Sequence, residues 1–291
     1  MANLKEIRTR ITSVNSTMQI TSAMKMVSAA KLKRAQNAVV QMRPYAEKLQ
    51  EILSNVSGSI DTADNPFVKD REEKNVLVVA LTSNRGLCGG FNNNVIKQTK
   101  RLVAEHGESS VTVLPVGKKA NDAFKKSSFI AKDNLPQNNS KLWDDLTFEN
   151  VNQLTEELMT SFKDGAFDKI IIVYNSFKNA AIQLIKTEQL LPIVKSENKS
   201  ESTNNTDYIF EPSQEEIIID LIPNSLKVSF YKAMLDSLAS EHGARMTAMH
   251  KATDNASELI KELKLTYNKA RQAAITNEIL EIVGGAEALN G

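Results

Sequence analysis

The feature that most constrains this chain is an apolar repeat that runs through its first 57 residues. A count that starts at Leu4 and advances alternately by three and four residues gives sixteen positions in this segment. Thirteen of these sixteen residues are apolar. A repeat sustained over so many heptads is typical of a coiled-coil helix, which at ~1.5 Å per residue would be roughly 85 Å long. The positions of this seam are Leu4, Ile7, Ile11, Val14, Met18, Thr21, Lys25, Ser28, Leu32, Ala35, Val39, Met42, Ala46, Leu49, Leu53 and Val56.

A second repeat fills the C-terminal part of the chain. Nine of its eleven positions are apolar, and because no proline follows Pro223 we expect a helix of about 60 residues. Upstream, Ser213 and Glu216 form a capping box, which predicts a separate short helix that ends at Pro223. The second seam consists of Val228, Tyr231, Leu235, Leu238, His242, Arg245, Met249, Ala252, Ala256, Leu259 and Leu263.

The simplest partner for each end helix is the other one, in an antiparallel coiled coil. If both helices leave the middle segment at one level, Met1 lies near residue 280 and about ten residues overhang as a single helix. We expect this tip to lack large side chains and to be either a frayed terminus or a slender rod inside a partner. Its most frequent residues are Gly284, Gly285, Ala286 and Ala288.

Three consecutive positions of the first seam are polar, and apolar residues lie beside them outside the seam. Apolar side chains on the outer face of a coil indicate an external partner. The alternative is a local rotation of the helix that moves the seam to Ile20, Met24 and Val27. The polar seam positions are Thr21, Lys25 and Ser28, and the apolar residues outside are Met24, Met26 and Val27.

Charge is distributed unevenly along the chain. The whole sequence has a net charge of +1, which argues against a dedicated nucleic-acid binder. Residues 1–57 carry nine lysines and arginines against three glutamates. This basic surface is either a solvated face or a contact for an acidic partner or a nucleic acid.

The remaining composition is that of a folded protein with a packed core. Cys88 is the only cysteine, which excludes an internal disulfide and fits a reducing cytosol. No apolar run is long enough to span a membrane, and the first ten residues resemble neither a signal nor a transit peptide. We therefore expect membrane contact only through partner proteins.

The middle of the chain predicts an α/β domain with a mostly parallel sheet. Buried strands are expected at residues 76–81, 111–116 and 170–174, with a further strand within 180–191. Helices are expected between them, at residues 91–106, 118–124 and 148–162. Residues 195–207 are polar and are expected to form a mobile loop.

A glycine-rich loop at residues 85–92 lies between the first strand and the first of these helices. It could hold an anion, but it matches neither dinucleotide nor P-loop fingerprint, so a tight turn is the better interpretation. Cys88 is expected to be buried and inert. His242 and His250 lie roughly 12 Å apart along one helix and cannot share a metal, so we expect no cofactor and no metal.

Three blocks of sequence resemble the γ subunits of bacterial F-type ATP synthases. The first is residues 10–27 with its continuation at 30–36, the second is Thr82 to Asn92, and the third is Ile275 to Ala288. The third block fits the pattern [IV]-T-x-E-x-x-[DE]-x-x-x-G-A. Matching blocks at both ends and in the middle make the resemblance specific.

The resemblance implies a non-catalytic rotor shaft. In this family an antiparallel coiled coil enters a hexamer of three α and three β subunits, and a Rossmann-like α/β domain packs around its foot beside the ε subunit and the c-ring. The shaft transmits torque between the proton-driven c-ring and the hexamer. The implied location is the cytoplasmic face of the inner membrane, as a peripheral subunit without nucleic-acid contact.

The resemblance implies contact roles for individual residues only where this sequence matches the motifs of the family. Met24 and Lys25 resemble the pair that the family places against the lever of the β subunit, and Arg271 and Gln272 resemble contacts with a β loop. Asn277 and Glu281 lie on the same terminal segment. The resemblance places three foot residues toward the c-ring, namely Tyr208, Phe210 and Glu211.

These observations predict a coiled-coil helix at 1–57, an α/β foot domain at 58–212 and a second coiled-coil helix at 213–291. The competing interpretation is an α/β nucleotide-binding enzyme with a coiled-coil oligomerisation arm. That enzyme would need the glycine-rich loop to bind phosphate.

Overall fold

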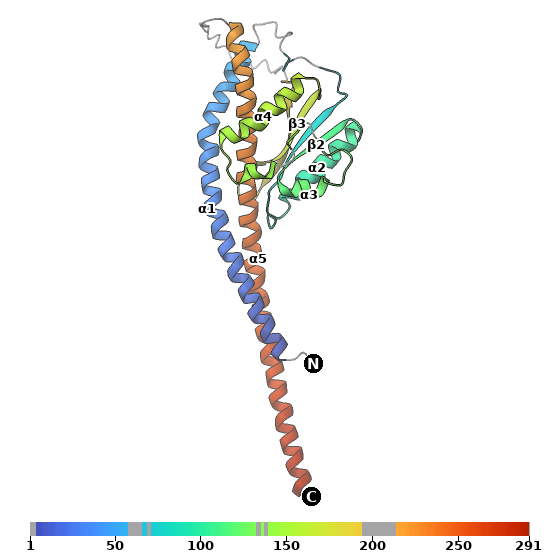
Figure 1. The fold of residues 1–291 in the computed structure, drawn as a ribbon. Coiled ribbons are helices and arrows are strands. Elements are labelled where there is room, and N and C mark those ends of the chain that lie inside the picture. The colour runs from blue at the N-terminus through green and yellow to red at the C-terminus, as the bar shows by residue number, and fades with distance from the viewer. Residues whose placement is uncertain are drawn as a thin grey trace. The chain divides into compact units, whose positions relative to one another are not determined.

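The computed structural model describes residues 4–57, 66–68, 71–131, 135–136, 139–193 and 214–290. The chain divides into two compact units, one of residues 1–28 with 246–291 and one of residues 29–245. Two long helices, α1 (Leu4–Ser57) and α5 (Gln214–Asn290), contribute to both units, and every strand belongs to the second (Figure 1).

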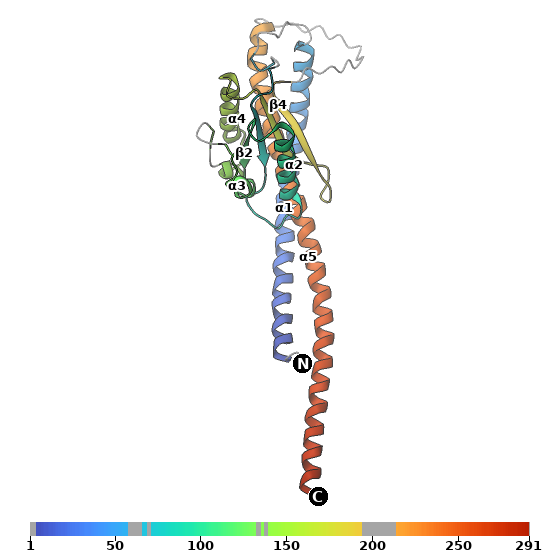
Figure 2. The ribbon, with the colours of Figure 1, turned by 90° about the vertical axis from the view of Figure 1, so that its right-hand side faces the viewer.

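The first unit is an antiparallel helix pair. Thr253 of α5 donates a hydrogen bond from its hydroxyl to that of Thr21 on α1, over 2.9 Å. One turn further along α1, the Nζ atom of Lys25 lies 3.4 Å from Nδ1 of His250. Residue numbers rise on one helix as they fall on the other, which confirms the antiparallel arrangement in this unit, and Figure 2 shows both helices of the pair.

The polar positions of the first seam remain in the interface. Thr21 is 9% exposed and Ser28 is 3% exposed, whereas Ile20 and Val27 are 60% and 57% exposed. The proposed rotation of the seam toward Ile20 and Val27 is therefore wrong. A short polar side chain is accommodated there because its hydroxyl finds a partner, as that of Thr21 does with Thr253.

The unpaired end of α5 is longer than expected. With Thr21 opposite Thr253, the first described residue of α1, Leu4, lies across from residue 270 of α5 and not near 280. From Ile275 to Ala288 every residue is exposed. The expectation of a tip without large side chains is also wrong, because five exposed residues there are large and apolar, namely Ile275, Ile279, Leu280, Ile282 and Val283.

The second unit contains a four-stranded sheet in the order β2-β1-β3-β4. The first three strands pair in parallel, and β4 pairs with β3 antiparallel at one edge. The predicted positions of these elements agree closely with the structure, although β3 extends beyond the expected residue 174. The elements are β1 (Val76–Leu81), α2 (Phe91–His106), β2 (Val111–Val116), α3 (Lys118–Phe124), the 3-10 helix η2 (Asn139–Trp143), α4 (Phe148–Lys163), β3 (Lys169–Phe177) and β4 (Gln183–Leu191).

Helices cover both faces of this sheet. On one face α2 and α3 pack against alternate strand residues such as Val78 and Val113. On the other face α4 and α5 pack against the intervening residues, among them Leu77 and Ile172 (Figure 1). All six residues of β1 are buried because this strand lies inside a three-layer sandwich.

The helix α5 does not stop at Pro223. It continues from Gln214 through the proline, so the expectation of a separate short helix is wrong, and Ser213 of the expected capping box lies outside the described residues. Proline removes one backbone hydrogen bond from a helix, but here both neighbouring turns are fixed by packing. Ile222 is 1% exposed and Leu226 is 4% exposed, and both belong to the core between α5 and the sheet.

Within the second unit α5 has two buried faces instead of one. Val228 packs with Ala46 and Leu49 of α1, which is the expected coiled-coil seam. Phe230, Ala233 and Met234 pack against the sheet side. The sequence repeat predicted only the first face, because the residues of the second are those that the heptad steps omit.

Candidate functional site

The glycine-rich loop follows β1 at the carboxyl end of the parallel strands. The chain leaves β1 toward β2 on one side and returns to β3 on the other, so this loop lies at the switch point where open α/β sheets usually bind ligands. The sequence left open whether the loop holds an anion or makes a tight turn. Its hydrogen bonds decide between these two interpretations.

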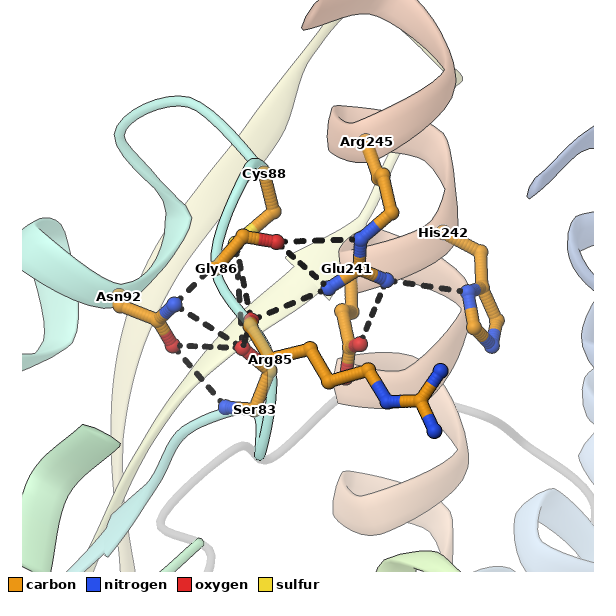
Figure 3. A network of polar contacts seen from close by, with 8 residues as sticks. All are labelled: Ser83, Arg85, Gly86, Cys88, Asn92, Glu241, His242 and Arg245. Atoms are coloured by element: carbon orange, nitrogen blue, oxygen red, sulfur yellow. Dashed lines mark hydrogen bonds and ion pairs between the residues drawn. The ribbon is translucent and has the colours of Figure 1, made fainter. Parts of the chain in front are cut away.

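The carbonyl groups of the loop are held by Arg245 of α5 (Figure 3). Nη2 of Arg245 donates to the carbonyl oxygen of Arg85 over 3.1 Å and to that of Gly86 over 3.3 Å. Nε of the same side chain also donates to the Gly86 oxygen, over 3.3 Å. The loop therefore presents oxygen atoms to a cation, which is the opposite polarity from a phosphate-binding loop.

Hydrogen bonds also hold the chain at both ends of the loop. The N–H of Ser83 donates to Oδ1 of Asn92 over 2.9 Å, and that of Phe91 donates to the carbonyl oxygen of Cys88. The hydroxyl of Ser83 donates to the carbonyl oxygen of Arg85 over 2.6 Å. These contacts fix the turn from inside, so we interpret the loop as a structural clasp between β1 and α5.

Cys88 is part of this clasp. Its side chain is 1% exposed, and Nδ2 of Asn92 lies 3.1 Å from the sulfur. Burial raises the pKa of the Cys88 thiol, which keeps it protonated and poorly nucleophilic. The expectation that Cys88 is buried is confirmed, and the raised pKa agrees with an inert thiol.

Arg245 is itself compensated inside the protein. Its Nη1 lies 2.7 Å from Oε1 of Glu241, and the two side chains are 9% and 10% exposed. Burial raises the pKa of Glu241, and the neighbouring Arg245 cation opposes that rise. Burial, assisted by Arg245, lowers the pKa of His242 to about 4. The only indication of this buried cluster in the sequence was the presence of two polar residues, His242 and Arg245, in an apolar seam.

The first predicted partner contacts, Met24 and Lys25, lie half-buried on α1 in the first unit. Beside them Ile20, Met26 and Val27 form an exposed apolar surface that faces away from the α5 seam. We call these three residues the outer apolar surface of α1.

The other four predicted contacts, Arg271, Gln272, Asn277 and Glu281, are exposed on α5. Asn277 and Glu281 are four residues apart and share one helix face, whereas successive residues such as Arg271 and Gln272 point about 100° apart. The four side chains therefore surround the helix and do not form one patch.

The tip of α5 carries a further feature that the sequence reading missed. Continuation of the seam beyond Leu263 meets Thr266, Ala270, Ala273, Asn277 and Leu280, of which only Leu280 is large and apolar. Three other large apolar residues, Ile275, Ile279 and Ile282, lie outside that continuation and recur with the spacing of one helix face. We call these three residues the tip stripe. A 3.6-residue count along residues 275–283 could have identified it.

The predicted foot contacts belong to a segment outside the described residues. Tyr208, Phe210 and Glu211 lie outside the described residues, as does the polar segment 195–207. Among the residues that the structure does describe, acidic, histidine and cysteine side chains form no group of three that could hold a metal ion. In the same part of the chain no helix is both long and apolar enough to cross a membrane.

Comparison with known proteins assigns a class to this architecture. The family model described as ATP synthase matches residues 3–289. Two relatives are named ATP synthase gamma chain. The relative from Flavobacterium psychrophilum is 61% identical to this chain and the one from Chlorobium phaeobacteroides is 49% identical, and both alignments cover the full length of this chain and of the relative. The chain belongs to the ATP synthase gamma chain family.

Solved structures agree with this assignment. A chain from the central stalk and c-ring of Tetrahymena thermophila mitochondrial ATP synthase is 26% identical, with a TM-score of 0.57, over 80% of this chain and 99% of that one. A chain from the Euglena gracilis mitochondrial ATP synthase, at 22% identity, has a TM-score of 0.66 over 98% and 94% of the two chains. The second similarity concerns the fold alone.

Proposed function

We propose that this chain is the central rotor shaft of an F-type ATP synthase, transmitting torque between the proton-driven c-ring and the catalytic α/β hexamer. Support comes from the gamma chain family and from the similarity to a central-stalk chain. In this proposal the chain is a non-catalytic subunit. The engagement of the Arg85 and Gly86 carbonyl groups by Arg245 at the switch point supports that assignment.

One observation supports the shaft role more than any other. The tip stripe consists of three large apolar side chains, between 48% and 71% exposed, on a part of α5 that extends beyond the described part of α1. Exposed apolar surface of this kind indicates a binding partner. A single helix with an apolar side fits an apolar sleeve, which we infer the hexamer provides around Ile275, Ile279 and Ile282.

The proposed mechanism of torque transmission depends on the asymmetry of the shaft. A shaft without three-fold symmetry presents a different face to each of three β subunits, and a bound surface shifts a conformational equilibrium only by its different affinity for the two states. Each face would therefore favour a different β conformation and nucleotide affinity. We assign Met24, Lys25, Arg271, Gln272, Asn277 and Glu281 to these β contacts, and their distribution around the helices suits partners on several sides.

The other partners follow from the same proposal. The ε subunit and the c-ring would bind the α/β foot, with Tyr208, Phe210 and Glu211 toward the c-ring. Membrane attachment would then be peripheral, at the cytoplasmic face of the inner membrane, and would depend on those partners.

Reconstitution tests the proposal. We would assemble purified chain with α and β subunits and compare wild type with Ile279→Asp, which adds a charge to the tip stripe. Asn268→Asp is the matched control, because Asn268 is exposed on the same helix outside the stripe. We expect weaker assembly and lower ATPase activity for Ile279→Asp only. Failure of the wild-type chain to assemble with α and β subunits would refute the shaft role.

A further inference from the structure

Lys25 is an isolated charged residue at a half-buried seam position of α1. It is the only charged residue between Arg10 and Lys31 on α1. It occupies a seam position, is half-buried, and has its Nζ atom 3.4 Å from Nδ1 of His250 on α5. A lysine ammonium only donates hydrogen bonds, so this contact requires His250 to offer a lone pair on Nδ1.

The same nitrogen atom has a second partner. Oδ2 of Asp254, one turn along α5, lies 3.4 Å from Nδ1 of His250. A carboxylate only accepts, so this contact requires a proton on Nδ1. One nitrogen cannot accept from Lys25 and donate to Asp254 at the same time. The two contacts are therefore alternatives, and the protonation of His250 selects between them.

The charges around His250 are few. Within four residues on α5 the only charged side chains are Lys251 and Asp254, and on α1 the only one along residues 11–30 is Lys25. Protonation would place a second positive charge beside the Lys25 ammonium, which repels it. Asp254 would stabilise the protonated ring in the same step.

We propose that His250 positions Lys25 according to pH. With a neutral imidazole, Nδ1 accepts from Lys25 and holds it against α5. With a protonated imidazole, Nδ1 donates to Asp254 and Lys25 turns outward toward its partner. The step requires only a proton from solvent. The consequence for catalysis rests on the proposed β contact of Lys25, whereas the positioning itself does not.

The positioning is tested on the full chain by chemical modification. We would acylate lysines between pH 8 and pH 5.5 and measure the ratio of Lys25 to Lys251 modification by mass spectrometry. In wild type this ratio should rise about two- to fivefold as the pH falls, as expected for release of an exposed contact. His250→Gln keeps an acceptor without the titration and should show a constant ratio.

Two further variants complete this test. Asp254→Asn should reduce the rise because it removes the partner of the protonated ring. His106→Gln, the same change on α2, should behave as wild type, and thermal melts would show that each variant is folded. An equal rise in wild type and His250→Gln, or no rise in wild type, would overturn the proposal.

The assembled enzyme tests the consequence separately. We would measure the ratio of ATP-driven proton pumping to ATP hydrolysis across the same pH range, and expect a pH-dependent component in wild type that is lost in His250→Gln. If the modification ratio changes with pH but the pumping ratio is identical in both enzymes, the positioning by His250 stands and the β contact of Lys25 is wrong.

Discussion

Replacing Arg245 by methionine tests the interpretation of the loop as a structural clasp. The side chain would keep its length but lose its donors to the Arg85 and Gly86 carbonyls and its ion pair with Glu241. Removing one member of a buried ion pair costs about 3–5 kcal/mol, because the other charge stays buried without compensation. We expect Arg245→Met to lower the free energy of unfolding by this amount at pH 8, measured by urea denaturation followed by circular dichroism.

The pH dependence of this loss identifies its cause. Burial raises the pKa of Glu241 above its ordinary value of 4.5, and loss of Arg245 removes a cation that opposes the rise. The folded chain then takes up a proton at higher pH than the unfolded chain, so lowering the pH relieves the cost of the buried carboxylate. The destabilisation should therefore be smaller at pH 6 than at pH 8.

A double variant provides the control. In Arg245→Met with Glu241→Gln both charges of the buried pair are absent, so part of the lost stability should return and the difference between pH 8 and pH 6 should shrink. Lys251→Met, on the same helix but exposed, should change stability by less than about 0.5 kcal/mol. A loss below about 1 kcal/mol that is independent of pH would refute the reasoning.

Three further predictions concern separate positions. The pKa of His242, lowered by burial to about 4 from 6.5, means that only the unfolded chain binds a proton between these values. Stability should therefore fall by up to about 3 kcal/mol from pH 6.5 to pH 4, and His242→Gln should flatten this slope in urea titrations. Gly117→Ala should cost about 2 kcal/mol or more, since φ is +115° and a Cβ would clash with the Thr82 carbonyl oxygen, whereas Gly165→Ala has open space and should cost less in thermal melts. Met24→Lys should reduce ATP-driven proton pumping relative to hydrolysis, because it adds a cation to the proposed β contact, and unchanged pumping would contradict that contact.

Local pattern was sufficient for most of the secondary structure. The buried run at residues 76–81 and the helical segment at 91–106 appear with the expected bounds, because strand and helix periodicity in a sandwich depend on which face is buried. The sequence pattern predicted a helix end at Pro223, and this prediction was wrong. The packing of Ile222 and Leu226 maintains the helix through the proline.

The candidate sites divide in the same way. Cys88 could be expected to be inert from its lack of a nearby base in the sequence, but the clasp around it could not be foreseen. It depends on Arg245, more than 150 residues along the chain from Gly86, and a contact between such distant residues leaves no periodic signal.

The sequence by itself determined that both ends of this chain form long helices with matched apolar seams, because a heptad repeat is a one-dimensional property. Only the tertiary structure decided that α5 has a second face against the sheet, that Arg245 holds the loop at the switch point, and that the tip stripe lies off the seam. Those features arise from the three-dimensional placement of side chains around a helix that serves two neighbours, and a repeat counted along one face cannot report the other.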